Sequence, residues 1–199
     1  MIPSGFRLLS GRLDRDAQCA LAREVLEATR NAPFYRPLCP GGKAMSVEMT
    51  NLGPLGWITD ASGYRYDCRH PVTGAPWPAI PAVLLGLWRE IADAVAPPDA
   101  CLVNLYRGDA RMGLHQDKDE ADLSFPVLSV SLGDTAVFRI GGLSRRASSR
   151  SLRLASGDVC LLAGEARLAY HGVDRILGGS SSVVPGGGRI NLTLRRSQP

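Results

Sequence analysis

The stretch VLSVSLGDTAVFRI (residues 127–140) decides the fold class of this chain. It predicts two short β-strands, 127–132 and 136–140, with a glycine and an aspartate between them. Working outward, further strands are predicted at 45–50, 63–67, 101–106, 112–117, 151–155, 158–163, 167–171 and 189–195. Many short strands separated by glycine and proline are typical of a barrel or a pair of packed sheets.

Two amphipathic helices are predicted before most of these strands. In 14–30, apolar residues recur at helical spacing, and Pro33 follows as a stop. In 81–96, Pro81 suits the first turn and Pro97 ends the helix. Its apolar stripe consists of Val83, Leu84, Leu87, Trp88, Ile91 and Val95. Two helices followed by many strands favour an α+β fold with a barrel or a two-sheet jelly roll.

The composition is that of an ordinary globular protein. The chain fits one domain, 1–199, with 45% hydrophobic and 21% charged residues. No apolar run approaches the roughly 18 residues of a membrane span, and the start does not resemble a secretory signal. Five scattered cysteines without a CxxC motif indicate reduced thiols and a cytoplasmic location. The glycine- and serine-rich segment 178–188 is expected to form a mobile loop.

The charge of the chain does not by itself assign a partner. A net charge of +4 is compatible with a polyanion without requiring one. The basic residues are nearly all arginine, since Lys43 and Lys118 are the only lysines. Arginine suits forked contacts with phosphate or carboxylate, but we regard codon bias in a GC-rich genome as the larger cause of the preference.

The triplet His115-Gln116-Asp117 is a candidate metal site. In a strand, residues i and i+2 point to one face, so an imidazole and a carboxylate would face the same point. A second imidazole would complete the 2-His-1-carboxylate triad of non-haem iron oxygenases. His171, at the end of the predicted strand 167–171, is the better candidate, and His70 in a proline-rich loop is the weaker one. The alternative is a surface His–Asp pair beside an unrelated histidine.

The C-terminal strand 189–195 alternates polar and apolar residues. Its polar face carries Arg189, Asn191, Thr193 and Arg195. The common reason for such alternation is an antiparallel strand with one solvated face. Two arginines and an amide in line would also hold a dicarboxylate, with one fork for each carboxylate. The pattern is repeated by Asn104 and Tyr106 on the strand that precedes His115.

Together these motifs strongly resemble one family of enzymes. The residues that carry the resemblance are Asn104-Leu-Tyr106, His115-Gln-Asp-Lys-Asp-Glu120, Val127–Gly133, Ser156-Gly-Asp-Val159, Tyr170-His-Gly172 and Arg189–Arg195. They resemble the AlkB family of dealkylating dioxygenases. The upstream stretches 49–57 and 63–66 resemble the nucleotide-recognition lid of its bacterial DNA-repair branch. The resemblance runs from about residue 5 to residue 196.

The resemblance implies a double-stranded β-helix (jelly-roll) core, with N-terminal helices packed outside and a lid at about 43–80. It implies Fe(II), 2-oxoglutarate and O₂ as cofactors. His115, Asp117 and His171 match the Fe(II) ligands. The positions that match the 2-oxoglutarate site are Tyr106 and Arg189 at its distal carboxylate, and Asn104, Asn191 and Arg195 at its metal-chelating end. The positions that match the base site are Trp57 and Tyr64 of the lid, Asp119 beside the exocyclic amine, and Arg145 at the pocket edge.

The implied activity is oxidative demethylation of bases such as 1-methyladenine and 3-methylcytosine. The products would be the repaired base, an aldehyde, succinate and CO₂. The expected partner is alkylated single- or double-stranded DNA, with RNA as a further substrate, and the expected state is a monomer.

Other readings stay open for both the function and its residues. The same chemistry on RNA, a protein side chain or a small metabolite is one alternative, and a non-catalytic nucleic-acid-binding jelly roll is another. Without the resemblance, Trp57 and Tyr64 would be read as core aromatics, and Asp119 as part of a solvated acidic run. The arginines at 145–153 would be read as a solubilising loop or a phosphate track.

Overall fold

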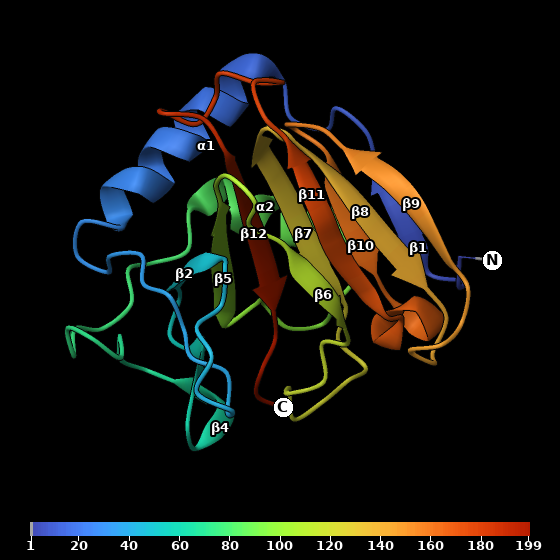
Figure 1. Cartoon of the computed structure of the whole chain (residues 1–199), viewed down its shortest axis with the longest axis horizontal. Coiled ribbons are helices and arrows are strands. Elements are labelled where there is room, and N and C mark those ends of the chain that lie inside the picture. The colour runs from blue at the N-terminus through green and yellow to red at the C-terminus, as the bar shows by residue number, and fades with distance from the viewer. Residues whose placement is uncertain (1) are drawn as a thin grey trace.

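The computed structural model describes residues 2–199, and its centre is a pair of antiparallel sheets (Figure 1). The larger sheet contains, in spatial order, β1 (Phe6–Leu9), β10 (Val159–Leu162), β7 (Val127–Gly133), β12 (Arg189–Arg195), β5 (Ala100–Tyr106) and β2 (Glu48–Leu52). The smaller sheet contains β6 (Met112–His115), β11 (His171–Leu177), β8 (Thr135–Gly141) and β9 (Ser149–Leu154). Two sheets wound in this way form the predicted jelly roll.

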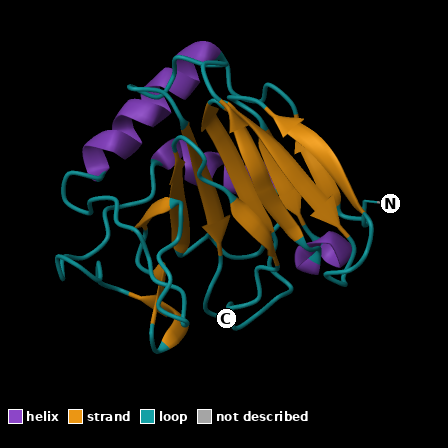
Figure 2. Cartoon of the chain, in the orientation of Figure 1, coloured by secondary structure: helices purple, strands orange, loops and turns teal. Residues whose placement is uncertain are grey.

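The helices α1 (Arg15–Ala28) and α2 (Ala82–Ile91) lie outside the sheets, as Figure 2 shows. One apolar cluster joins both helices to the outer face of the larger sheet, and a second fills the space between the sheets. Strand β12 shows why: its buried Ile190, Leu192 and Leu194 belong to the helix-facing cluster. Burying each such side chain contributes about 1.5–3 kcal/mol. The polar residues of β12 therefore face the space between the sheets.

A separate hairpin lies beside these sheets. It consists of β3 (Gly56–Asp60) and β4 (Gly63–Asp67), joined by a two-residue turn. Ile58 on one face of the hairpin packs into a small cluster with Trp77, Ala32 and Tyr35. The opposite face of the hairpin does not take part in this cluster.

The second predicted helix ends earlier than expected. It stops at Ile91 instead of continuing to residue 96, because Asp93 adopts a left-handed conformation (φ 49°) that a helix does not accommodate. Leu84, Leu87, Trp88 and Ile91 are buried as predicted, whereas Val83 is exposed and Val95 is fully exposed.

Two strand predictions near the histidines were also inaccurate. Residues 164–168 form a short 3-10 helix, η1 (Gly164–Leu168), so His171 begins β11 instead of ending a strand. Strand β6 ends at His115, which places Asp117 two residues beyond it. The strands β1 and β3 were not predicted.

The segment 178–188 is anchored to its surroundings, contrary to the expectation of a mobile loop. The Asp134 carboxylate accepts hydrogen bonds from the backbone N–H groups of Ser181 and Gly188, both at 3.0 Å. Val183 and Val184 are buried in the cluster beneath the helices. Because the segment leads directly into β12, these contacts fix the start of the strand that carries Arg189.

Candidate active site

The smaller sheet brings two histidines together. His115 at the end of β6 and His171 at the start of β11 are directly paired across the two strands, and their ring centroids lie 4.5 Å apart. The strands approach closely at Gly172, where a Cβ atom would lie 2.6 Å from the Met112 carbonyl oxygen. Asp117 joins the pair, and one ligand atom from each residue lies within 4.8 Å of the others.

Backbone carbonyls orient both imidazoles. Nδ1 of His115 hydrogen-bonds the Gly113 carbonyl, and Nδ1 of His171 hydrogen-bonds the Ala169 carbonyl, each at 2.9 Å. This leaves both Nε2 atoms facing the Asp117 carboxylate, at 3.7 and 3.8 Å. Such outer contacts set the tautomer and direction of metal-binding histidines.

The charge states suit a cation. Burial, followed by the neighbouring His115, lowers the pKa of His171 to about 4, so its imidazole is neutral near pH 7. Burial alone would raise the pKa of Asp117, but Arg195 and the two histidines outweigh it and hold that pKa well below its usual range. A neutral imidazole at His171 and an ionised carboxylate at Asp117 are the forms that bind a metal ion.

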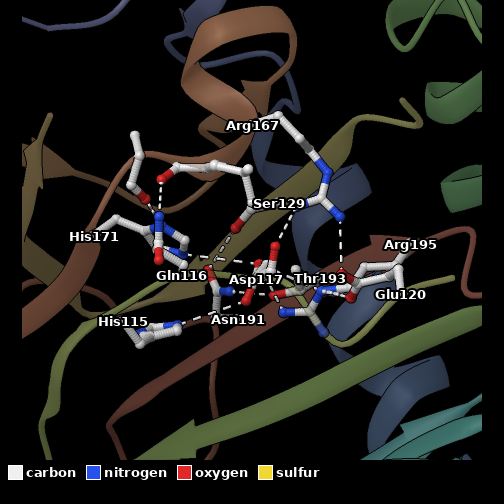
Figure 3. A network of polar contacts seen from close by, with 12 residues as sticks. His115, Gln116, Asp117, Glu120, Ser129, Arg167, His171, Asn191, Thr193 and Arg195 are labelled. Atoms are coloured by element: carbon white, nitrogen blue, oxygen red, sulfur yellow. Dashed lines mark hydrogen bonds and ion pairs between the residues drawn. The ribbon is translucent and has the colours of Figure 1, made fainter. Parts of the chain in front are cut away.

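A network of buried charged side chains continues from Asp117 through neighbouring ion pairs (Figure 3). Arg195 Nη2 lies 2.9 Å from Asp117 Oδ2, and Arg195 Nε lies 3.3 Å from Glu120 Oε1. Arg167 Nη2 in turn lies 2.9 Å from Glu120 Oε2. The four side chains are 2–8% exposed and alternate in sign, so each buried charge has a partner of opposite sign.

The polar face of β12 lies directly beside that of β5. Arg189 is paired with Tyr106 across the two strands, and Asn191 with Asn104. Arg189 is 1% exposed, and within residues 2–199 its guanidinium hydrogen-bonds only neutral groups. These are Ser131 Oγ at 2.8 Å, Asn191 Oδ1 at 3.0 Å and the Leu154 carbonyl at 3.3 Å.

All of the predicted site residues line one cavity of about 320 Å³. They are Trp57, Tyr64, Asn104, Tyr106, His115, Asp117, Asp119, Arg145, His171, Arg189, Asn191 and Arg195. Arg189 and Asp117 are buried, whereas Tyr64, Asp119 and Arg145 are exposed. The cavity therefore joins a buried, charged interior to an aromatic and acidic rim.

Comparison with known proteins shows the family to which the chain belongs. The 2OG-Fe(II) oxygenase superfamily matches residues 5–195. The chain is 66% identical to the alpha-ketoglutarate-dependent dioxygenase AlkB homolog of Caulobacter vibrioides over 98% of this chain and 88% of that protein. It is 43% identical to the alpha-ketoglutarate-dependent dioxygenase AlkB of Escherichia coli, over 89% and 83% of the two chains.

The chain belongs to the AlkB family of 2OG-Fe(II) oxygenases. The solved structure of OsALKBH1 superimposes on this AlkB-family chain with a TM-score of 0.82 and 32% identity, covering 98% and 99% of the two chains. A Pseudomonas putida prolyl-4-hydroxylase shares the fold with a TM-score of 0.54 at 15% identity. The protein is thus a dioxygenase that uses Fe(II), 2-oxoglutarate and O₂.

The residues of this AlkB-family chain fit both cofactors. Two imidazoles and one carboxylate form the facial set that non-haem Fe(II) oxygenases use, with the cavity on the open side. Within residues 2–199, Arg189 Nε and Asn104 Oδ1 are buried and have no hydrogen-bond partner. A buried cation with only neutral contacts is costly. A carboxylate of 2-oxoglutarate would supply the missing anion at Arg189.

A hydrogen bond and an aromatic stack hold side chains in place at the rim of the cavity. Trp57 Nε1 donates to Asp119 Oδ2 at 2.8 Å. The rings of Trp57 and Tyr64 stack at 5.5 Å with 20° between their planes. Arg145 lines the same cavity from the loop before β9.

His70 is a structural residue. It is 1% exposed, and its Nε2 hydrogen-bonds the Pro33 carbonyl at 2.7 Å. Its Nδ1 accepts from the backbone N–H groups of Val72 and Thr73. Both ring nitrogens are therefore engaged away from the triad, as expected for the weaker candidate.

Sequence reasoning missed the residues that support the triad. Arg167 donates to the carbonyls of Asp117 and Phe125, and Gln116 Nε2 donates to the Leu168 carbonyl. These contacts tie η1 to the loop that carries Asp117. Glu120 lies within an acidic run that looked solvated, and nothing in the spacing around Arg167 signals its partners.

Proposed function

We propose that this dioxygenase repairs alkylated DNA by oxidative demethylation of cationic bases such as 1-methyladenine and 3-methylcytosine. The observation that carries the proposal is the pairing of Trp57 with Asp119 on the rim of the cavity that also holds the His115–Asp117–His171 triad. An aliphatic metabolite would need neither the aromatic rim nor its carboxylate.

The rim favours a positively charged aromatic ligand. The faces of Trp57 and Tyr64 attract a cation, an effect of about 0.5–1 kcal/mol at exposed sites and about 2 kcal/mol when water is excluded. The Asp119 carboxylate adds charge pairing on the same rim. Methylation at the pairing edge makes adenine and cytosine cationic and weakens their pairing. Such a base is therefore also easier to flip out of a helix.

When bound, Fe(II) and 2-oxoglutarate supply the oxidation, in which 2-oxoglutarate and O₂ give succinate and CO₂ and the N-alkyl group leaves as an aldehyde after hydroxylation. The chain supplies the positioning. His115, Asp117 and His171 would hold the metal, and Arg189 would hold the distal carboxylate of 2-oxoglutarate. The lid, residues 43–80, would place Trp57 against the damaged base, and the buried interior would exclude water.

A turnover experiment tests the proposal. The protein is loaded without oxygen with Fe(II) and 2-oxoglutarate, then exposed to air with oligonucleotides that carry one cationic, one neutral or no alkylated base. We expect aldehyde and repaired base from the cationic adducts. Asp119→Asn should lower turnover of the cationic adduct more than that of the neutral one, whereas Asp122→Asn, a change at a half-buried residue outside the cavity, should alter neither.

Two results would overturn the proposal. Equal turnover of modified and unmodified oligonucleotides would exclude damage recognition. Rapid 2-oxoglutarate consumption stimulated by a protein or metabolite, with none stimulated by nucleic acid, would assign the same chemistry to another substrate.

The proposal includes RNA as a further substrate, a monomeric state and a cytoplasmic location. All five cysteines carry free thiols, which agrees with a reducing compartment. Within residues 2–199, no helix combines the length and apolar character that crossing a membrane would demand. RNA oligonucleotides in the same panel, and the molar mass of the loaded protein in solution, test the first two points.

A further inference from the structure

The hairpin of the lid, β3 and β4, contacts the loop that carries Asp117 at two points. Trp57 and Tyr66 are directly paired across β3 and β4, so both side chains leave the same face of the hairpin. Trp57 Nε1 donates to Asp119 Oδ2 at 2.8 Å, and the Tyr66 hydroxyl donates to Glu120 Oε1 at 2.6 Å. One contact is at the exposed rim, and the other reaches a buried carboxylate.

The second contact continues to the metal ligand. Glu120 Oε1, which accepts from Tyr66, lies 3.3 Å from Arg195 Nε. Arg195 Nη2 lies 2.9 Å from Oδ2 of Asp117. A continuous line of polar contacts therefore runs from the hairpin to the carboxylate of the triad. Burial raises the pKa of Tyr66, so its hydroxyl stays protonated and remains a donor.

The partners of Tyr66 have little freedom to move independently. Glu120 and Arg195 are 2% and 7% exposed as side chains, and Arg167 holds the other oxygen of Glu120. A displacement of the hairpin would remove a hydrogen bond from a carboxylate that two arginines already hold. Charge-assisted bonds of this kind are stronger than those between neutral groups. The position of the hairpin and the orientation of Asp117 are thus linked by the same buried group.

We propose that Tyr66 is a positioning residue that couples the seating of the lid hairpin to the orientation of the Asp117 carboxylate, through Glu120 and Arg195. The inference rests on the proposed function, because the hairpin carries the residues that would read the base. It predicts that metal binding and nucleic-acid binding strengthen each other. Such linkage is reciprocal and is typically about 5- to 150-fold.

The test measures this linkage without turnover. The affinity for a 3-methylcytosine oligonucleotide is determined under nitrogen by fluorescence anisotropy, with and without Fe(II). In the wild-type chain, Fe(II) should tighten binding by at least about 5-fold. In Tyr66→Phe, which removes only the hydroxyl, this factor should fall to about 1. Tyr35→Phe is the matched control, because the Tyr35 hydroxyl is also buried but has no partner within residues 2–199.

A second measurement needs no nucleic acid. Hydrogen exchange of the amides in 56–67 should slow when Fe(II) binds the wild-type chain, and this change should be absent in Tyr66→Phe. A thermal melt first establishes that the variant is folded.

The outcomes separate the inference from the proposed function. Where methylated bases are repaired, an Fe(II) factor that is equal in wild type and Tyr66→Phe, or a wild-type factor of 1, overturns the coupling and leaves the proposed function intact. Metal-dependent protection of the hairpin that requires Tyr66 supports the coupling even if the oligonucleotide is not a substrate.

Discussion

Replacing Arg167 with methionine should destabilise the protein far more than replacing an exposed arginine. Arg167 is 4% exposed, and its guanidinium donates to the Phe125 carbonyl at 2.7 Å, to the Asp117 carbonyl and to Glu120 at 2.9 Å. Methionine keeps an apolar stem of similar reach but leaves two carbonyls and a buried carboxylate short of a donor. Breaking one side of a buried ion pair costs about 3–5 kcal/mol.

The control for this change is Arg12→Met. Arg12 also forms an ion pair, with Glu90 at 2.6 Å, but the two side chains are 35% and 59% exposed. Exposed pairs contribute about 0.2–1 kcal/mol. The two variants remove the same kind of charge, so the difference of roughly 2–5 kcal/mol between them isolates the effect of burial.

Urea unfolding of the metal-free protein, followed by circular dichroism, gives both free energies. A loss of about 3–5 kcal/mol is a large part of the 5–15 kcal/mol by which folded proteins are usually stable. Arg167→Lys should recover only part of the loss, because an ammonium group lacks the fork that reaches three acceptors. If Arg167→Met and Arg12→Met lost equal stability, the buried network would not support the loop that carries Asp117, and the reasoning would be refuted.

Four further variants or treatments probe the site. His171→Ala should abolish 2-oxoglutarate turnover and metal binding, and wild-type activity would remove His171 from the ligand set. Trp57→Ala should weaken turnover of methylated oligonucleotide while slow 2-oxoglutarate consumption without substrate persists; equal losses would make Trp57 structural. Arg189→Met should raise the KM for 2-oxoglutarate by about 10- to 100-fold, since a hydrogen bond to a charged group contributes about 1.5–3 kcal/mol, and an unchanged KM would contradict the assignment. Iodoacetamide at pH 8 should label the exposed Cys68 but not Cys101, because burial raises the pKa of Cys101 to about 12 and little thiolate forms; labelling of Cys101 in the folded protein would disprove its burial.

The parts of the fold that sequence predicted well are those with strong local patterns. Strand β12 has the predicted bounds, because its strict alternation matches a strand with an apolar and a polar face. The end of α2 was misplaced because the left-handed Asp93 precedes the prolines that were read as the stop. A single residue's backbone conformation is not visible in an apolar stripe.

The site was predictable where family motifs carry it, and not where the fold alone creates it. His115 and His171 are drawn together by two adjacent strands, Asp117 follows two residues after the first of them, and their motifs were recognisable. Glu120 and Arg167 lie 47 positions apart in the chain and meet only because η1 packs beside the metal loop. Local pattern does not encode such a pair, so nothing in the sequence indicated that these two charges are buried against each other.

The two-residue turn between β3 and β4 has a consequence for how the lid can vary. Because side chains alternate across a strand, one inserted residue that shifts a hairpin strand by a single position would rotate its aromatic residues to the opposite side. Trp57 would exchange places with its neighbour Ile58, which now fills the small cluster with Trp77. The proposed base reading and the anchorage of the hairpin would then be lost in one step. Length in this turn is therefore under tighter constraint than the identity of the exposed residues within it.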